Sequence, residues 1–142
     1  TSLTPEEYVI LSLLPTLTMN RSPFAAQLLE LVRAELRKQK GGVSILMGSV
    51  GVLCNLLKFG SPVRETAFIP ILGILGCKFP KARMEAATAL YSAVLLDPSV
   101  IGDDDSGEKT DEIMDLLANT EWTARLPEIA EPRKRLAELL KE

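Results

Sequence analysis

The sequence predicts an all-α fold in which short helices pack together through aliphatic side chains. The chain has 142 residues, of which 46% are hydrophobic and only 5% are aromatic. Its core must therefore consist mainly of Leu, Ile, Val and Ala. Leu and Ala favour helices, whereas strands favour aromatic and β-branched residues. Repeated helix-start signals and very short connections predict the same class, and the length suits one domain of roughly 100–150 residues.

Helix starts recur along the chain as a residue followed by proline. Proline fits the first helical turn, where its missing N–H would have no partner. A polar capping residue precedes the proline in Thr4-Pro5, Ser22-Pro23 and Ser61-Pro62, whereas Phe79-Pro80 lacks that polar cap. From these signals we expect helices over residues 5–19, 23–40, 43–58, 62–77, 80–96, 109–119 and 121–141.

Four further prolines fall inside these expected helices, at Pro15, Pro70, Pro127 and Pro132. An internal proline removes a backbone hydrogen bond and clashes with the preceding turn. We therefore expect each of them to kink or split its helix.

The connections are short enough to force consecutive helices into antiparallel hairpins. Examples are Lys40-Gly41-Gly42 and Phe59-Gly60-Ser61. Ser22-Pro23 and Ser61-Pro62 lie 39 residues apart, close to the roughly 40–47 residues of a HEAT or armadillo repeat. We therefore expect a HEAT/armadillo-like right-handed superhelical stack of antiparallel helix pairs, with about six to seven helices.

Two segments resemble the HEAT signature, in which proline opens a helix and a Val-Arg-x-x-Ala stretch follows. The better copy is Pro62-Val63-Arg64-Glu65-Thr66-Ala67, and a weaker one is Pro80-Lys81-Ala82-Arg83 followed by Ala86-Ala87. Because the copies lie on adjacent helices, two ways of pairing helices into repeats remain open. Residues 1–142 are expected to form a single helical-repeat domain, a fragment of a larger HEAT-repeat protein.

The segment from Gly41 to Leu57 carries no charged residue, which raises the alternative of a membrane-associated helical domain. It is shorter than the roughly 20 residues that cross a bilayer. A buried central helix is the preferred interpretation, because such a helix is apolar all round. The spacings Gly48-x-x-Gly51 and Gly73-x-x-Gly76 are expected to be close helix contacts, since neither has the phosphate-loop pattern.

Residues 97–108 are expected to form an acidic, mobile loop around the run Asp103-Asp104-Asp105-Ser106-Gly107-Glu108. The run does not match a calcium loop, because glycine and glutamate are not at the sixth and twelfth positions. A solvated loop is the preferred interpretation, and a weak phosphorylation or partner site is the alternative.

The sequence offers no set of residues suited to catalysis or to binding a metal or cofactor. The chain has no histidine, which excludes Ser-His-Asp and Cys-His arrangements. Cys54 and Cys77 lie in apolar helical runs and are expected to be small buried hydrophobes in a reducing compartment. We expect no enzyme activity, cofactor, metal or small-molecule substrate. The net charge of -3 argues against nucleic acid.

We also expect a cytoplasmic location. The chain opens with Thr4-Pro5-Glu6-Glu7 rather than with a basic stretch leading into an apolar one. The carboxy-terminal helix is charged, so the fragment is further expected to cap one end of its solenoid, because terminal repeats carry a polar outer face.

Three blocks of residues carry a resemblance to a known family. They are Leu56-Leu57-x-Phe59 with Val63-Arg64-x-x-Ala67, then Phe79-Pro80-x-x-Arg83-x-x-x-Ala87-x-x-x-Tyr91, and finally Thr120-x-Trp122-x-x-x-Leu126 with Arg133-x-Arg135-Leu136-x-x-Leu139-Leu140. In this order, from about Ser22 to Leu140, they resemble the carboxy-terminal domain of the tubulin folding cofactor D (tubulin-specific chaperone D) family. Pro127, Pro132 and the acidic run depart from the family pattern.

The resemblance implies a cytoplasmic, cytoskeleton-associated chaperone that binds β-tubulin. It also implies cooperation with tubulin folding cofactors C and E in assembling the α/β-tubulin heterodimer, association with an ARF-like small GTPase, and a non-catalytic part in activating GTP hydrolysis by tubulin. An unrelated HEAT-repeat adaptor or structural solenoid segment is the alternative function.

Matched residues divide into packing and partner candidates. Residues expected to serve the helical packing are Phe59, Val63, Arg64, Phe79, Pro80, Tyr91 and Leu136. Arg64 and Arg83 are expected near helix starts, where they could bridge to carboxylates of the next repeat. The partner-binding candidates are Arg133, Lys134, Arg135, Trp122 and Arg83. Trp122 is also a candidate anchor for the last helix. Three consecutive basic residues fan across a wide arc of a helix, so at least two of them should face solvent.

Overall fold

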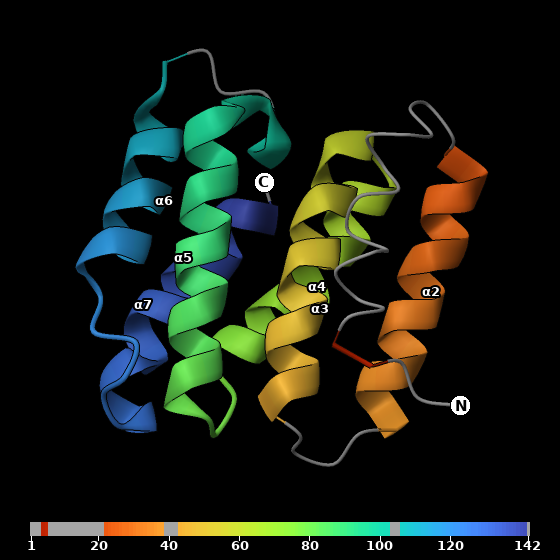
Figure 1. Cartoon of the computed structure of the whole chain (residues 1–142). Helices are drawn as coiled ribbons and strands as arrows, with labels where there is room; N and C mark the ends of the chain where they lie inside the picture. The colour runs from red at the N-terminus through yellow and green to blue at the C-terminus, as the bar shows by residue number, and fades with distance from the viewer. Residues whose placement is uncertain (1–3, 6–21, 39–42, 103–105, 142) are drawn as a thin grey trace.

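The computed structural model describes residues 4–5, 22–38, 43–102 and 106–141 (Figure 1). Within these residues the fold is all-helical, with no strand, which confirms the predicted class. The elements are α2 (Ser22–Lys38), α3 (Val43–Leu56), η1 (Leu57–Phe59), α4 (Val63–Leu75), α5 (Pro80–Leu96), η2 (Pro98–Ile101), α6 (Glu108–Asn119) and α7 (Leu126–Lys141).

The helices form two layers. One layer holds α3, α5 and α6, and the other holds α2, α4 and α7, with α3 and α5 each packed against α4 (Figure 1). Short segments join α3 to α4, α4 to α5 and α6 to α7, as the helical-hairpin prediction requires. The expected short connection Lys40-Gly41-Gly42 lies outside the described residues, and η2 lies between α5 and α6. The right-handed superhelical course of the stack remains a prediction.

The last helix pair enters the stack in reversed order. Along α2, α3, α4 and α5 the chain alternates between the layers, so α2 packs on α4 and α3 packs on α5. The next helix in that alternation would lie beside α4. Instead α6 packs beside α5, and α7 returns to pack beside α4. Helix η2 lies between α5 and α6 in the sequence and packs against α5.

Most helix boundaries agree with the prediction, and the exceptions involve prolines. Helix α5 runs from Pro80 to Leu96, with Phe79 as its N-cap residue. The last helix was expected from residue 121 but begins at Leu126, because Pro127 suits a first turn better than a helix interior. Helices α4 and α7 continue across Pro70 and Pro132 and are not split. Pro15 and the expected helix over residues 5–19 lie outside the described residues, apart from residue 5.

The expected mobile loop over residues 97–108 is wrong in its first part. Pro98–Ile101 forms the helix η2, and its Val100 and Ile101 side chains are buried. Asp97 caps this helix by accepting a hydrogen bond from the Ser99 N–H at 3.2 Å. Two buried aliphatic residues after the capping aspartate anchor this stretch to the core. Residues 103–105 lie outside the described residues.

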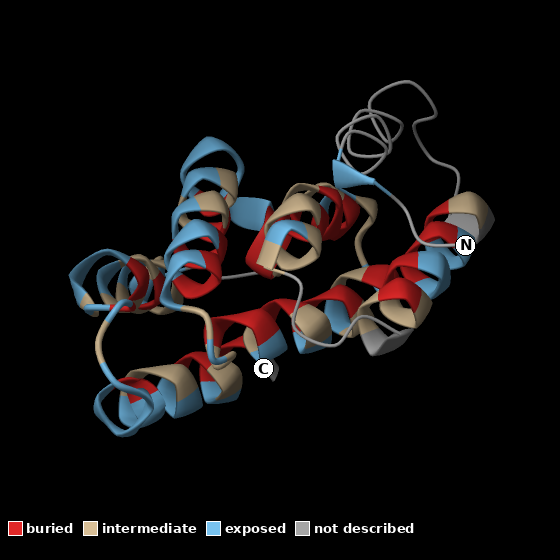
Figure 2. Ribbon diagram, turned by 60° about the horizontal axis from the view of Figure 1, so that its bottom comes forward, coloured by how far each residue is buried: buried red, intermediate tan, exposed pale blue. Residues whose placement is uncertain are grey.

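The core is aliphatic, as the composition predicts, and it runs between the two layers (Figure 2). Among the described residues its buried aromatic members are Phe68 and Trp122. Cys54 is buried within it, and Cys77 is half-buried at its edge. Three polar or charged residues are also buried in the described part of the chain: Glu35, Ser49 and Arg83.

Gly73 and Gly76 do not form the expected helix-to-helix contact. A Cβ atom at Gly73 would meet nothing within 4 Å, so Gly73 faces open space. A Cβ atom at Gly76 would lie 2.5 Å from Nε of Arg133, which is a side-chain contact instead of a helix-to-helix approach. The structure describes no helix that is both long enough and apolar enough to span a membrane.

Candidate protein-binding surface

The basic cluster on α7 contains three residues with three different environments. Lys134 is exposed and forms no ion pair with any residue that the structure describes. Arg135 is also exposed, whereas Arg133 is half-buried. Two of the three thus face solvent, as the helical geometry predicts.

Arg133 joins α7 to α4. Its Nε donates a hydrogen bond of 2.8 Å to the carbonyl oxygen of Leu72. In a continuing helix that oxygen would accept from the N–H of Gly76, but Gly76 donates to Gly73 instead. Arg133 therefore satisfies a carbonyl at the carboxy-terminal end of α4, where positive charge is also favoured by the helix dipole.

Arg135 joins α7 to α6 through Glu112. Its Nε and Nη2 donate to the two carboxylate oxygens at 2.5 and 2.9 Å, and its Nη1 lies 3.4 Å from Glu138. The hydrogen bond from Arg135 lowers the pKa of Glu112, and the Glu112 carboxylate raises the pKa of Arg135. Arg135 is thus paired with a carboxylate, whereas Lys134 is the exposed member of the cluster that forms no ion pair with a described residue.

Arg83 is buried, with 2% of its surface exposed, and its guanidinium meets three carbonyl oxygens. Nε donates to Trp122 at 2.7 Å, Nη1 to Cys77 at 2.6 Å and Nη2 to Ala124 at 2.6 Å. It thus ties the turn after α4 to the turn before α7. This burial corrects the expectation that Arg83 contacts a partner or a carboxylate of the next repeat.

Trp122 lies in the turn between α6 and α7 and is 1% exposed. Its indole N–H donates to the carbonyl oxygen of Leu117 at 3.0 Å. A buried indole with its N–H satisfied is the arrangement of a packing anchor. Trp122 is therefore not available at the surface as a partner-binding residue.

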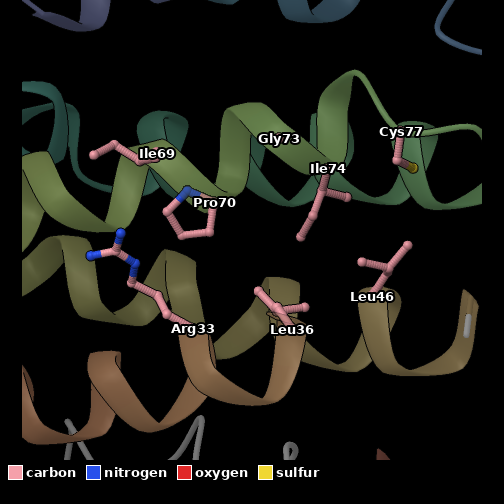
Figure 3. Close-up of a pocket in the computed structure, with 8 residues that line it drawn as sticks. All are labelled: Arg33, Leu36, Leu46, Ile69, Pro70, Gly73, Ile74 and Cys77. Atoms are coloured by element: carbon pink, nitrogen blue, oxygen red, sulfur yellow. The ribbon is translucent and has the colours of Figure 1, made fainter. Parts of the chain in front are cut away.

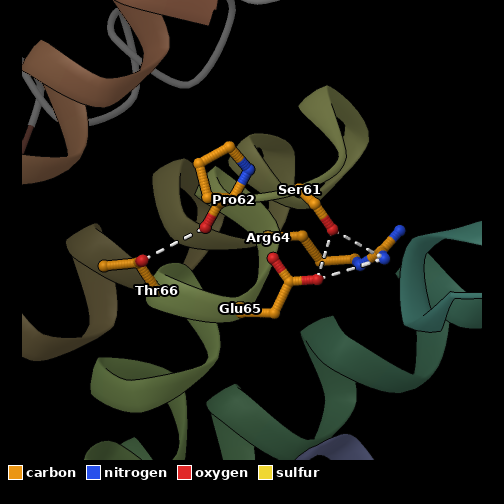
Figure 4. Close-up of polar contacts among 5 residues, drawn as sticks. All are labelled: Ser61, Pro62, Arg64, Glu65 and Thr66. Atoms are coloured by element: carbon orange, nitrogen blue, oxygen red, sulfur yellow. Dashed lines mark hydrogen bonds and ion pairs between the residues drawn. The ribbon is translucent and has the colours of Figure 1, made fainter. Parts of the chain in front are cut away.

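Arg64 lies near the start of α4, in a local polar network (Figure 4). Its Nη2 lies 3.2 Å from both the Ser61 hydroxyl and a Glu65 carboxylate oxygen, and the hydroxyl donates to the same oxygen at 2.5 Å. The hydrogen bond from Ser61 is the main cause of the lowered pKa of Glu65. Arg64 thus pairs within its own helix end and not with a neighbouring repeat.

The remaining motif residues serve packing to different degrees. Val63 and Leu136 are buried in the core. Phe59, Phe79 and Tyr91 are half-buried and pack against it, while Pro80 is exposed at the start of α5. Packing against the core therefore accounts for the spacing of these residues within the motif blocks.

An open apolar hollow lies between α2 and α4, and Leu46 of α3 lines it at the end where Cys77 lies (Figure 3). Its volume is about 330 Å³, and its lining residues are Arg33, Leu36, Leu46, Ile69, Pro70, Gly73, Ile74 and Cys77. Ile69 is 61% exposed, and Gly73 contributes no side chain to the mouth. We call this surface the α2–α4 hollow.

Arg33 and Cys77 lie at opposite ends of the α2–α4 hollow, with the apolar residues between them (Figure 3). The Arg33 side chain reaches from α2 toward Ile69 and Pro70 on α4. Its Nη1 lies 3.4 Å from Glu30, and both side chains are partly solvated. The sequence motifs did not indicate this surface, because the exposure of Ile69 depends on the packing of helices that are not consecutive in the chain.

The described residues contain no group of three or more Cys, Asp or Glu placed to hold a metal ion. Comparison with known proteins adds no assignment, because no family model and no solved structure matches the chain. Two features among the described residues could contact a partner: the α2–α4 hollow, with the exposed Ile69 at its edge, and the exposed Lys134 on α7.

Proposed function

We propose that this chain is a non-catalytic scaffold that binds other proteins. The observation that carries the proposal is the α2–α4 hollow, in which Ile69 is exposed beside an unfilled apolar space. Exposed apolar surface next to a hollow is the usual feature of a protein-binding site. The buried Arg83 has a structural role, because its guanidinium donates to three backbone carbonyl oxygens.

Within that class, the chain is proposed to be the carboxy-terminal part of a tubulin-specific chaperone of the cofactor D type. The support is the order of the motif blocks from Leu56 to Leu140, together with the all-helical stack. The proposed partners are β-tubulin, tubulin folding cofactors C and E, and an ARF-like small GTPase. In this role the chain assists heterodimer assembly and activation of GTP hydrolysis, and the hydrolysis itself belongs to tubulin.

The motif residues Val63 and Leu136 are core residues, and an unrelated HEAT-repeat adaptor would need similar packing. A binding experiment must therefore separate the two functions. The chain is immobilised and offered purified tubulin, cofactors C and E, and an ARF-like GTPase, each alone and in combination. We expect retention of tubulin or of a cofactor complex, with serum albumin as the negative control. If none of these proteins is retained while the immobilised chain is folded by circular dichroism, the tubulin assignment is wrong.

A further inference from the structure

We propose that the α2–α4 hollow binds a segment of a protein partner in which a carboxylate lies close to a large apolar side chain. The inference rests on the proposed scaffold function and names the chemistry of one of its contacts. The apolar side chain occupies the space between Leu36, Leu46 and Ile74, and the carboxylate pairs with Arg33.

Charge complementarity selects the carboxylate. Among the described residues that line the hollow, Arg33 is the only charged one. Its contact with Glu30 is long at 3.4 Å, and Glu30 has 64% of its side chain exposed, so this ion pair is weak. Guanidinium groups bind carboxylates through two parallel hydrogen bonds, which a well-placed partner carboxylate can form in place of Glu30.

The size and openness of the hollow select a protein segment over a free small molecule. A volume of about 330 Å³ lies near the lower end of the range of roughly 300–1,000 Å³ for ligand cavities. Its mouth is open at Gly73, where a Cβ atom would meet nothing within 4 Å. A small molecule there would remain largely solvated. Side chains of a segment lying across α2 and α4 can fill the hollow while the backbone of the segment covers its mouth.

Gly73 provides a variant that blocks the hollow without disturbing the core. In Gly73→Leu the new side chain starts in open space and extends into the mouth. Leucine also favours a helix more than glycine does, so the fold should be retained. Gly73→Ala is the matched control, because its single methyl group leaves the mouth open. Arg33→Gln removes the charge and keeps most of the side-chain length.

The probes are short synthetic peptides with a central Leu-Phe pair and one Asp placed at successive distances from it. Each has a counterpart with Asn in place of Asp. Binding to the full chain is measured by calorimetry and by NMR shifts of Ile69 and Ile74. We expect at least one Asp peptide to bind, roughly tenfold weaker binding in Gly73→Leu, and unchanged binding in Gly73→Ala. Arg33→Gln should weaken the Asp peptide roughly tenfold and leave the Asn peptide unchanged.

Other results would overturn the inference. These are the absence of shifts at Ile69 and Ile74 with every peptide, or equal binding by Gly73→Leu and the wild type. Self-association that Gly73→Leu abolishes would identify a second copy as the occupant. Binding of dodecanoate as tight as that of the best peptide would identify a small amphipathic acid instead. If the immobilised chain retains tubulin but no peptide binds, the inference about the hollow is wrong and the proposed scaffold function is unaffected.

Discussion

Arg133 and Leu72 are 61 residues apart, yet the guanidinium of the first bonds the carbonyl oxygen of the second at 2.8 Å. Gly76 makes this contact possible, because a Cβ atom there would lie 2.5 Å from Nε and 2.9 Å from Cδ of Arg133. The basic cluster of α7 is therefore partly a structural element, and its members have to be tested separately.

Gly76→Ala should destabilise the fold by displacing Arg133. The lost hydrogen bond is worth about 0.5–1.5 kcal/mol, with an additional cost for moving the side chain. Arg133→Ala should cost a similar amount, and the double variant should cost less than the sum of the two, because without Arg133 the new methyl group meets no obstacle. Urea denaturation of the wild type, the two single variants and the double variant measures the coupling energy between the two positions. Strict additivity would show that Gly76 and Arg133 act independently.

Arg83→Met should be among the more damaging substitutions in the chain. Methionine preserves the apolar stem but leaves the carbonyl oxygens of Cys77, Trp122 and Ala124 without their shared donor. We expect a loss of about 2–4 kcal/mol in the free energy of unfolding. Thermal melting followed by Trp122 fluorescence measures it. Arg125→Met, at an exposed arginine, is the control, and equal melting temperatures for the two variants would contradict the role given to Arg83.

Cys54 should make stability decline at high pH. Burial raises the pKa of its thiol from 9.0 to about 12. The folded-state pKa is therefore above the unfolded value. The contribution of the protonated thiol to the free energy of unfolding is complete below pH 9.0 and is lost as the pH rises toward about 12. In Cys54→Ala, the decline of stability across this range should be shallower than in the wild type, and urea midpoints at several pH values test this. Parallel pH profiles would show that Cys54 ionises freely in the folded chain.

Lys134→Glu should slow association with tubulin or its cofactor complex and leave the fold intact. Lys134 is exposed, and an exposed charge mainly affects the encounter rate of oppositely charged partners. On the tubulin-chaperone proposal the partner is acidic, so the association rate should fall and become less dependent on salt. Stopped-flow mixing at two ionic strengths measures both. Lys81→Glu, on α5 in the other layer, is the control, and identical rates for both variants and the wild type would exclude Lys134 from the contact.

Local signals in the sequence predicted the fold class and most helix ends. Phe79-Pro80 marked the start of α5, since proline and the extended residue before it have strong local preferences. Trp122 illustrates the limit of such signals. A tryptophan at this position is equally compatible with a packing anchor and with a partner interface. Its burial depends on packing between helices that are distant in the chain.

The partner surface was harder to predict than the fold. Arg83 was a partner candidate as a matched residue of the second motif block, but three carbonyl groups from two separate turns surround it. The α2–α4 hollow arises from the space between two helices that are not consecutive in the chain. Spacing along the sequence does not report the width of such a space, so Ile69 and Gly73 were not identified as surface residues in advance.

The reversed order of the last helix pair has a consequence for folding kinetics. In a regular array each repeat touches only its neighbours, so folding can start anywhere and spread along the chain. Here α7 packs against α4, with α5 and α6 between them in the sequence. Helix α7 can complete its contacts only after α4 and the chain between them have been ordered, and contacts over such long sequence distances slow folding. The carboxy-terminal pair should therefore fold as the closing step of the whole domain and not as an independent repeat.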